Sequence, residues 1–267
     1  MTNVKVQCPA KVNLTLKVVG KREDGFHNID SIMQTINLYD YLSITVIDSD
    51  VNEIHLEGNS KEIPYDETNL VYKAAMLYLN KVKVSPKSVF IYIEKNIPVA
   101  AGLAGGSTDA AGTIYGLNKL LGDILSESQM HELCAQLGSD LNVCLKGGCI
   151  KASGRGEILD PMVFKEFNVS LIKPLNLGIS AKEAYTKFSQ KIKNKVNLES
   201  REKYINDLEW AIIDDYKELQ FIKNNYPKSD MTGSGSTYFM IDNNFVQTEG
   251  YWVKNDLKTV ADGVKLV

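Results

Sequence analysis

The chain has 267 residues, of which 44% are hydrophobic and 24% are charged, and its formal net charge is −3. A chain of this length and composition can bury a sizeable core without disulfides. Because the net charge is negative, the sequence gives no sign of a basic surface, so we expect neither nucleic acid nor a membrane as a partner. No apolar stretch predicts a membrane span, and the alternating N-terminal residues lack an apolar signal region. We therefore expect a cytoplasmic protein with reduced thiols. The cysteines form no C-x-x-C pair and the three histidines are scattered, so no zinc site is expected.

The first half of the chain begins with alternating apolar and polar residues, the pattern of half-buried strands. Such segments are centred on residues 12–18, 42–46, 54–56 and 89–93. Apolar residues at helical spacing predict three helices in the same half, one of them opened by a capping box of Ser126 and Gln129. The helices are expected to start after Thr68 or Asn69, near Ser107 and after Ser126, and the last two to stop at Gly122 and Gly138.

The second half predicts a strand over residues 168–173, helices over 181–191 and about 200–224, and a strand after Met231. Glycines and a proline interrupt the pattern between residues 155 and 165, so we place a domain boundary there, giving domains 1–158 and 159–267. Because strands and helices do not alternate regularly, the α+β class is favoured over a doubly wound sheet.

The most informative segment is Pro98-Val-Ala-Ala-Gly-Leu-Ala-Gly-Gly-Ser-Thr-Asp-Ala-Ala-Gly112, between a predicted strand and a predicted helix. Its glycines allow close approach of the backbone to a ligand, and free N–H groups at a helix start attract phosphate. It is neither a Walker A motif nor G-x-G-x-x-G. On the glycines alone, a phosphate loop and a tight packing loop are equally consistent with the sequence.

The full string resembles the phosphate-binding signature of the GHMP kinase superfamily. Two more segments resemble the same superfamily in the expected order, Pro9-Ala-Lys-Val-Asn-Leu14 and Met231-Thr-Gly-Ser-Gly-Ser-Thr-Tyr-Phe239. The resemblance implies a two-domain GHMP kinase fold, with an N-terminal domain like domain 2 of ribosomal protein S5 and a C-terminal ferredoxin-like α/β sandwich.

Within the superfamily, the chain is most similar to the family of 4-diphosphocytidyl-2-C-methyl-D-erythritol kinases. The similarity lies in Ala10 to Leu16, in Gly20-Lys-Arg-Glu-Asp-Gly-Phe-His27 and in Gly138-Ser-Asp-Leu141. It implies an ATP-dependent kinase that phosphorylates the 2-hydroxyl of the cytidine diphosphate-linked methylerythritol in the non-mevalonate route to isoprenoid precursors. Asn142 departs from the family, which usually has proline there, and residues 242–267 are short and divergent.

The resemblance assigns Asp140 as the base that accepts the proton of the substrate hydroxyl, and Lys11 as its ionic partner. A lysine there can stabilise charge on the attacking oxygen. Alternation by itself favours a solvent-facing Lys11, opposite Val12 and Leu14. Asp140 by itself reads equally well as a turn residue after a helix end.

The resemblance also implies an ATP site and a substrate site. Phe26, His27 and Asn13 are expected to bind the acceptor, with the two rings on the cytosine. Asp24-Gly25 by itself indicates a hairpin turn under which Phe26 packs. Mg²⁺ is implied because ATP phosphates need it, with Ser107 as an indirect ligand and no protein metal site. The ATP phosphates are expected to contact Pro98, Val99, Ala100, Ala101, Gly102, Leu103, Ala104, Gly105, Gly106, Ser107 and Thr108.

Two rival functions remain at this point. One is another GHMP enzyme, such as homoserine kinase or a mevalonate-pathway kinase, which the Asp-Gly-Phe-His element disfavours. The other is a protein without catalytic activity that keeps the fold as a ligand sensor or an RNA-binding module. Lys11, Asp140 and the intact glycine segment argue against the sensor, and the acidic balance argues against RNA.

Overall fold

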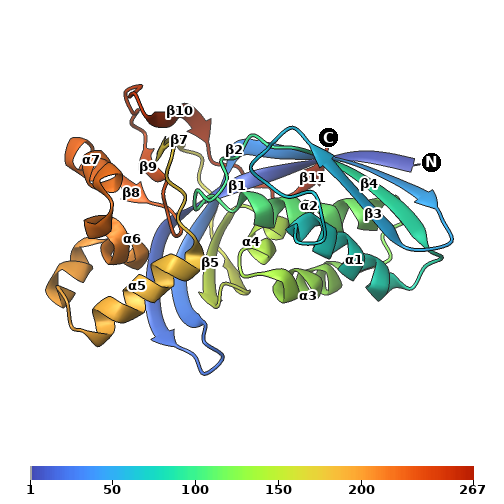
Figure 1. Ribbon diagram of the computed structural model, residues 1–267, viewed down its shortest axis with the longest axis horizontal. Helices are drawn as coiled ribbons and strands as arrows, with labels where there is room; N and C mark the ends of the chain where they lie inside the picture. Colours follow the sequence, from blue (N-terminus) through green and yellow to red (C-terminus); the bar gives the residue numbers. More distant parts are fainter. Residues whose placement is uncertain (1) are drawn as a thin grey trace.

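The computed structural model describes residues 2–267 and contains two β-sheets flanked by helices (Figure 1). The first sheet has the order β11-β1-β2-β4-β3, with β5 beside β2 and β6 beside β5. The sheet order joins both ends of the chain, because the last strand pairs with the first. Its strands are β1 (Thr2–Lys21), β2 (His27–Asp48), β3 (Glu53–Gly58), β4 (Lys87–Glu94), β5 (Cys149–Gly154), β6 (Ile158–Pro161) and β11 (Lys265–Leu266).

The four strands expected in the first half are confirmed, and β1 and β2 form the longest antiparallel pair. A shift in their register falls between Pro9 and Ala10. Val6 and Cys8, before the shift, pack beneath the helices, whereas Ala10 and Val12, after it, pack in a separate core with the second sheet. The middle of β1 is therefore covered on both faces, so simple alternation cannot tell which of its residues meet solvent.

Four helices cover one face of the first sheet (Figure 1). The expected caps are confirmed: the Asn69 side chain accepts a hydrogen bond from the N–H of Val71, and Ser126 and Gln129 form a reciprocal capping box. The second helix begins at Gly105, two residues before the expected start. The helices are α1 (Leu70–Val82), α2 (Gly105–Leu120), α3 (Glu127–Leu137) and α4 (Leu141–Lys146).

The second sheet has the order β10-β7-β9-β8 and packs against the remaining helices. The single helix expected over residues 200–224 is wrong, because the chain breaks into several short helices there. Asn206 accepts hydrogen bonds from the N–H groups of Leu208 and Glu209 and so starts a new helix. Tyr216 is extended, with φ at −129°, and interrupts the helical conformation again before α7. The elements are β7 (Asn168–Pro174), α5 (Ala181–Lys193), the 3₁₀ helix η1 (Leu198–Lys203), α6 (Asp207–Ile212), η2 (Ile213–Asp215), α7 (Lys217–Asn225), β8 (Asp230–Met231), β9 (Tyr238–Ile241) and β10 (Tyr251–Lys258).

The α+β class is confirmed, and the domain boundary at residue 158 stays a prediction. Strand β11, from the divergent C-terminal segment, pairs with β1 at Val6 and Gln7. The chain therefore leaves the first sheet after β6, builds the second sheet, and returns to the first. Within residues 2–267, no helix combines the length and the apolar character that crossing a membrane requires.

Helix α2 packs unusually close to β1 and β2 because glycines face the strands. A Cβ at Gly112 would lie 2.4 Å from Sγ of Cys8, and one at Gly116 would lie 2.7 Å from Cδ1 of Ile44. No real side chain fits at such distances without a shift of its neighbours. Since the N-terminus of α2 carries the glycine-rich segment, this packing fixes where that segment lies over the sheet.

We predict that Gly112→Ala destabilises the protein although alanine is the better helix former. Overpacking against Cys8 should cost about 1–3 kcal/mol of unfolding free energy, part of which the helix propensity offsets. In a Cys8→Ala background, the same change should cost at least about 1 kcal/mol less, since the clashing sulfur is gone. Denaturant unfolding of the four proteins measures this coupling, and equal costs in both backgrounds would contradict the packing argument.

Candidate active site

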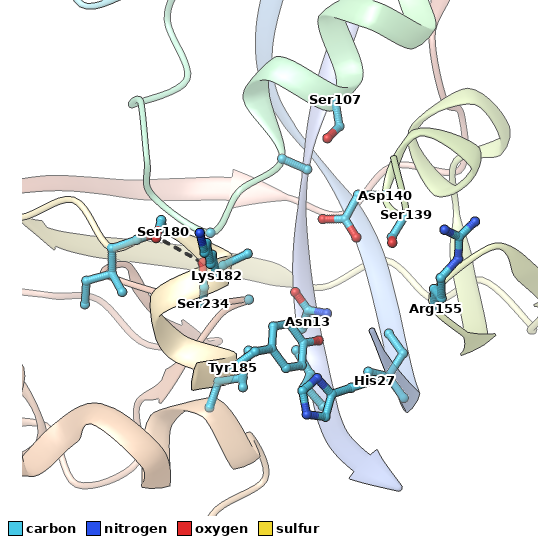
Figure 2. A pocket seen from close by; sticks show the side chains of 18 of the residues that line it. Asn13, His27, Ser107, Ser139, Asp140, Arg155, Ser180, Lys182, Tyr185 and Ser234 are labelled. Carbon is cyan, nitrogen blue, oxygen red and sulfur yellow. Dashed lines mark hydrogen bonds between the residues drawn. The ribbon is translucent and has the colours of Figure 1, made fainter. Parts of the chain in front are cut away.

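A single large cavity of about 1490 Å³ lies where the glycine-rich segment, the β1–β2 hairpin and helix α5 meet. It brings together residues far apart in the sequence, as Figure 2 shows for Asn13, His27 and Asp140. Of the residues expected at the site, only Thr108 does not line the cavity, because it is fully buried in α2. The expected residues that do line it are Lys11, Asn13, Phe26, His27, Asp140 and each residue from Pro98 to Ser107.

The glycine-rich segment, residues 98–108, forms a loop that ends in the first turn of α2. Gly102 and Ala104 adopt positive φ values of 74° and 62°. Ala104 is the N-cap of α2 and makes no side-chain capping bond. The N–H groups of the first turn are therefore left for a ligand, and the helix dipole favours an anionic one.

The two adjacent glycines at the start of α2 differ in direction. A Cβ on Gly105 would point into the protein, 3.0 Å from Nζ of Lys95 and 3.2 Å from Cγ2 of Ile97. A Cβ on Gly106 would meet no atom within 4 Å, although Gly106 lines the cavity. A side chain added at Gly106 would therefore occupy space in the cavity without displacing other parts of the protein.

Behind the loop lies a buried charge cluster that the sequence did not reveal. The ammonium group of Lys95 contacts the carboxylates of both Asp40 and Asp109, at 2.8 Å from the latter. Burial raises the pKa of Asp109 well above its usual range, and Asp40 adds to this while Lys95 opposes it. The cluster ties the end of β4 to β2 and to the second turn of α2, and so supports the loop from below.

Lys11 is 2% exposed and not solvent-facing, so the expectation from alternation is wrong. Its Nζ donates to Oδ1 of Asn13 at 2.6 Å and to the carbonyl of Gly102 at 3.0 Å. It also lies 3.4 Å from Oδ2 of Asp140. These three contacts match the three N–H bonds of an ammonium group and aim it at one side of the cavity.

Asp140 is the N-cap of α4 and keeps 30% of its side chain exposed to the cavity. The extended Gly138, which ends α3, and Ser139 lead into it. Asn142, the departure from the family pattern, is buried two residues further on, and its Oδ1 bonds to Nδ1 of His131 at 3.0 Å. Asn142 therefore joins α4 to α3 and does not line the cavity.

The third motif, around Gly233, closes the cavity from the second sheet. Oγ1 of Thr232 accepts a hydrogen bond from the N–H of Asn13 at 2.9 Å and lies 3.3 Å from the carbonyl of Gly102. The amide of Asn206 donates to the carbonyls of Met231 and Gly233. All three sequence motifs thus meet at Thr232, and Asn206 holds the backbone of the third motif in place.

Aromatic residues line the end of the cavity near the β1–β2 hairpin. His27 stacks on Tyr185 of α5 with centroids 5.0 Å apart, and its Nε2 lies 3.0 Å from Oγ of Ser189 (Figure 2). Burial, with the nearby Lys21, lowers the pKa of His27, so the neutral ring is favoured. Phe26 is 52% exposed and does not pack beneath the hairpin. Tyr185 was not among the residues predicted for the site. Its spacing of three residues from Lys182 and four from Ser189 places all three on the cavity side of α5.

Comparisons with known proteins identify the family of this chain. Residues 69–148 match the model of the GHMP kinases N terminal domain. The chain is 40% identical over 260 residues to 4-diphosphocytidyl-2-C-methyl-D-erythritol kinase of Clostridioides difficile, covering 90% of this chain and 86% of that one. The chain belongs to the 4-diphosphocytidyl-2-C-methyl-D-erythritol kinase family. The resemblance seen in its motifs is therefore confirmed.

Other members of this kinase family and of the GHMP superfamily extend the comparison. The kinase of Caldanaerobacter subterraneus is 38% identical over 259 residues, covering 90% of this chain and 88% of that one. A crystal structure of 4-(cytidine 5'-diphospho)-2C-methyl-D-erythritol kinase aligns with a TM-score of 0.73 at 27% identity, covering 95% of this chain and 98% of that one. Homoserine kinase from Cytophaga hutchinsonii aligns at 0.72 with 16% identity, covering 100% and 98%, which shows a shared fold alone.

We predict that Gly106→Val weakens ATP binding while the fold remains intact. The added side chain would stand where the first-turn N–H groups face the cavity, and the lost charge-assisted hydrogen bonds should raise KM for ATP roughly tenfold or more. The paired variant Gly105→Val should also lower Tm, because its side chain meets Lys95 and Ile97. Steady-state kinetics and thermal melting test both. Normal ATP affinity in a folded Gly106→Val protein would show that the phosphates bind elsewhere.

Proposed function

We propose that this chain transfers the γ-phosphate of ATP to the 2-hydroxyl of 4-diphosphocytidyl-2-C-methyl-D-erythritol and releases ADP, in the non-mevalonate route to isoprenoid precursors. The observation that carries the proposal is the Lys11–Asp140 pair, 3.4 Å apart in the cavity. The uncapped start of α2 supplies an anion site nearby, and the aromatic residues at the hairpin supply a site for a base.

The pair suits proton removal from an alcohol. In the proposed reaction Asp140 accepts the proton of the 2-hydroxyl, whose oxygen attacks the γ-phosphorus of ATP. The bond from the γ-phosphorus to the β–γ bridging oxygen breaks, and ADP leaves with that electron pair. Lys11 stabilises the negative charge that develops on the attacking oxygen and on the transferred phosphoryl group, because its ammonium group is held in place before the substrates arrive.

The ATP phosphates are proposed to lie across the first turn of α2, where N–H groups and the helix dipole face the cavity. Beyond the loop the cavity continues past Asn69 to the apolar side chains of Ile63 and Leu70. An apolar wall with a polar edge suits the adenine ring. The nucleotide would thereby span from α1 to the Lys11–Asp140 pair.

Mg²⁺ is proposed to bind with the nucleotide. Within residues 2–267 there is no group of three or more His, Cys, Asp or Glu able to hold a metal ion. The cavity does offer an oxygen donor, the Ser107 hydroxyl, and Mg²⁺ prefers oxygen ligands while keeping waters and substrate phosphates. Bound there, the ion would neutralise charge on the β- and γ-phosphates.

The acceptor is proposed to place its cytosine among Phe26, His27 and Tyr185 and its sugar alcohol at Asp140. Neutral His27 bonds to Ser189 through Nε2 and leaves Nδ1 for the edge of a base. Asn13, already bonded to Lys11, would orient the hydroxyl groups. Homoserine and mevalonate carry no base for this aromatic end, so a coupled ADP-release assay with all three acceptors tests the proposal.

We predict that Asp140→Asn lowers kcat by roughly a hundredfold or more, the usual scale for general acid–base catalysis, with little change in either KM. The amide keeps the shape of the carboxylate but cannot accept the hydroxyl proton. Asp160→Asn, an exposed change outside the cavity, serves as the control. Turnover of Asp140→Asn within a few-fold of the parent would exclude Asp140 as the base.

We predict that Phe26→Ala and His27→Ala each raise KM for the acceptor while KM for ATP stays nearly constant. Stacking of a base on an aromatic ring is worth roughly 1–3 kcal/mol, so an increase of about tenfold is expected. Phe26→Ala should leave Tm unchanged because the ring is exposed. His55→Ala is the matched control, a histidine stacked on Phe90 outside the cavity. Lower Tm with normal acceptor affinity would point to a packing role instead.

A further inference from the structure

We propose that Arg155 binds the diphosphate of the acceptor and so determines the preference for a cytidine diphosphate-linked substrate. The inference rests on the proposed function, which it deepens by assigning the part of the acceptor between the base and the sugar alcohol.

The cationic residues of the cavity fall into two groups. Lys11, Lys95 and Arg201 each contact a carboxylate, on Asp140, on Asp40 and Asp109, and on Asp207 respectively. In the part of the chain that the structure describes, the second group donates no side-chain hydrogen bond. Its members are Lys21, Arg155, Lys182 and Lys193. The charges of the first group are neutralised within the protein, whereas those of the second group are available to an anionic ligand.

Arg155 stands apart within the second group because it lies between the two ends of the acceptor site. Its guanidinium carbon is 5.1 Å from the centroid of the Phe26 ring, at the end proposed for the base. The next residue, Gly156, packs against Ser139, with an ideal Cβ only 3.2 Å from the Ser139 carbonyl. Figure 2 shows Arg155 beside Ser139 and Asp140, with Lys182 on the far side of the cavity.

The turn that carries Arg155 is held firmly at its backbone. The N–H of Arg155 donates to Oε2 of Glu157 at 2.6 Å, and the N–H of Gly156 donates to the Ser153 carbonyl at 3.0 Å. The guanidinium itself has a weak internal partner, with Nε 3.9 Å from Glu157. The backbone is thus fixed while the side-chain donors stay open, an arrangement that suits ligand binding better than structural support.

A diphosphate fits this position chemically. In the acceptor, the diphosphate separates the cytidine from the methylerythritol, so it must lie between the hairpin aromatics and Asp140. Guanidinium presents a rigid fork of N–H donors that pairs with phosphate oxygens in bidentate fashion. Its position over the Phe26 ring orients the fork before the ligand arrives.

The test compares cytidine diphosphate with cytidine, two ligands that differ only in the diphosphate. Calorimetric Kd values are measured for the full chain and for Arg155→Met and Arg155→Lys. We expect Arg155→Met to weaken cytidine diphosphate roughly tenfold or more, the scale of hydrogen bonds to a charged group, and to leave cytidine unchanged. Arg155→Lys keeps the charge without the fork of N–H donors, so its Kd for cytidine diphosphate should lie between those of the parent and Arg155→Met. Raised salt should weaken cytidine diphosphate more in the parent than in Arg155→Met.

Lys151→Met is the matched control, since Lys151 lies on strand β5, which leads into the turn of Arg155, and pairs with Asp30 outside the cavity. It should leave both ligands unaffected. Equal weakening of cytidine and cytidine diphosphate by Arg155→Met would overturn the inference, because Arg155 would then act on the base through Phe26. Unchanged binding of both in a variant with the parent Tm would overturn it as well.

The proposed function can fail separately. A parent protein that binds cytidine diphosphate through Arg155 but does not phosphorylate the acceptor would contradict the proposed reaction and support the inference. An active parent whose Arg155→Met variant keeps the parental Kd for cytidine diphosphate and the parental KM for the acceptor would contradict the inference alone.

Discussion

The site depends on the burial of one ammonium group. Lys11 is almost entirely removed from water, and a buried charge without partners would cost several kcal/mol. Its partners come from three separate segments: Asn13 on its own strand, the carbonyl of Gly102 in the phosphate loop, and Asp140 at the start of α4. Each segment must be in place before the charge is satisfied. The same contacts that make the burial tolerable therefore assemble the groups proposed for catalysis.

Close backbone contact joins the two halves of the chain at this point. A Cβ on Gly102 would lie 2.2 Å from the carbonyl of Thr232, and one on Gly233 would lie 2.7 Å from the carbonyl of Gly102. The glycines of the glycine-rich segment and of the motif around Gly233 thus allow the two backbones to pack closely, in addition to leaving room for a ligand. Thr232 completes the link by bonding to Asn13. One cavity can therefore draw residues from both halves of the chain.

The charges around the cavity divide into those that are neutralised internally and those that are open to a ligand. Lys95 lies between two buried carboxylates and supports the loop, whereas Arg155 and Lys182 have no carboxylate in hydrogen-bonding contact within residues 2–267. Both proposed substrates are strongly anionic. A chain with a net charge of −3 can attract them only by concentrating unpaired cations in one place.

Local patterns determined much of this protein. Alternation and helical spacing predicted the strands of the first half, and the caps at Asn69 and Ser126 follow from hydrogen bonds between near neighbours in the chain. The ordered motifs identified the family, because their residues are contiguous. What tertiary structure alone decided are relations between distant residues. Lys11 is buried because both faces of β1 are covered, and Tyr185 and Arg155 reach the cavity only because α5 and the β5–β6 turn pack around the hairpin. Such contacts depend on long-range packing, which no local periodicity encodes.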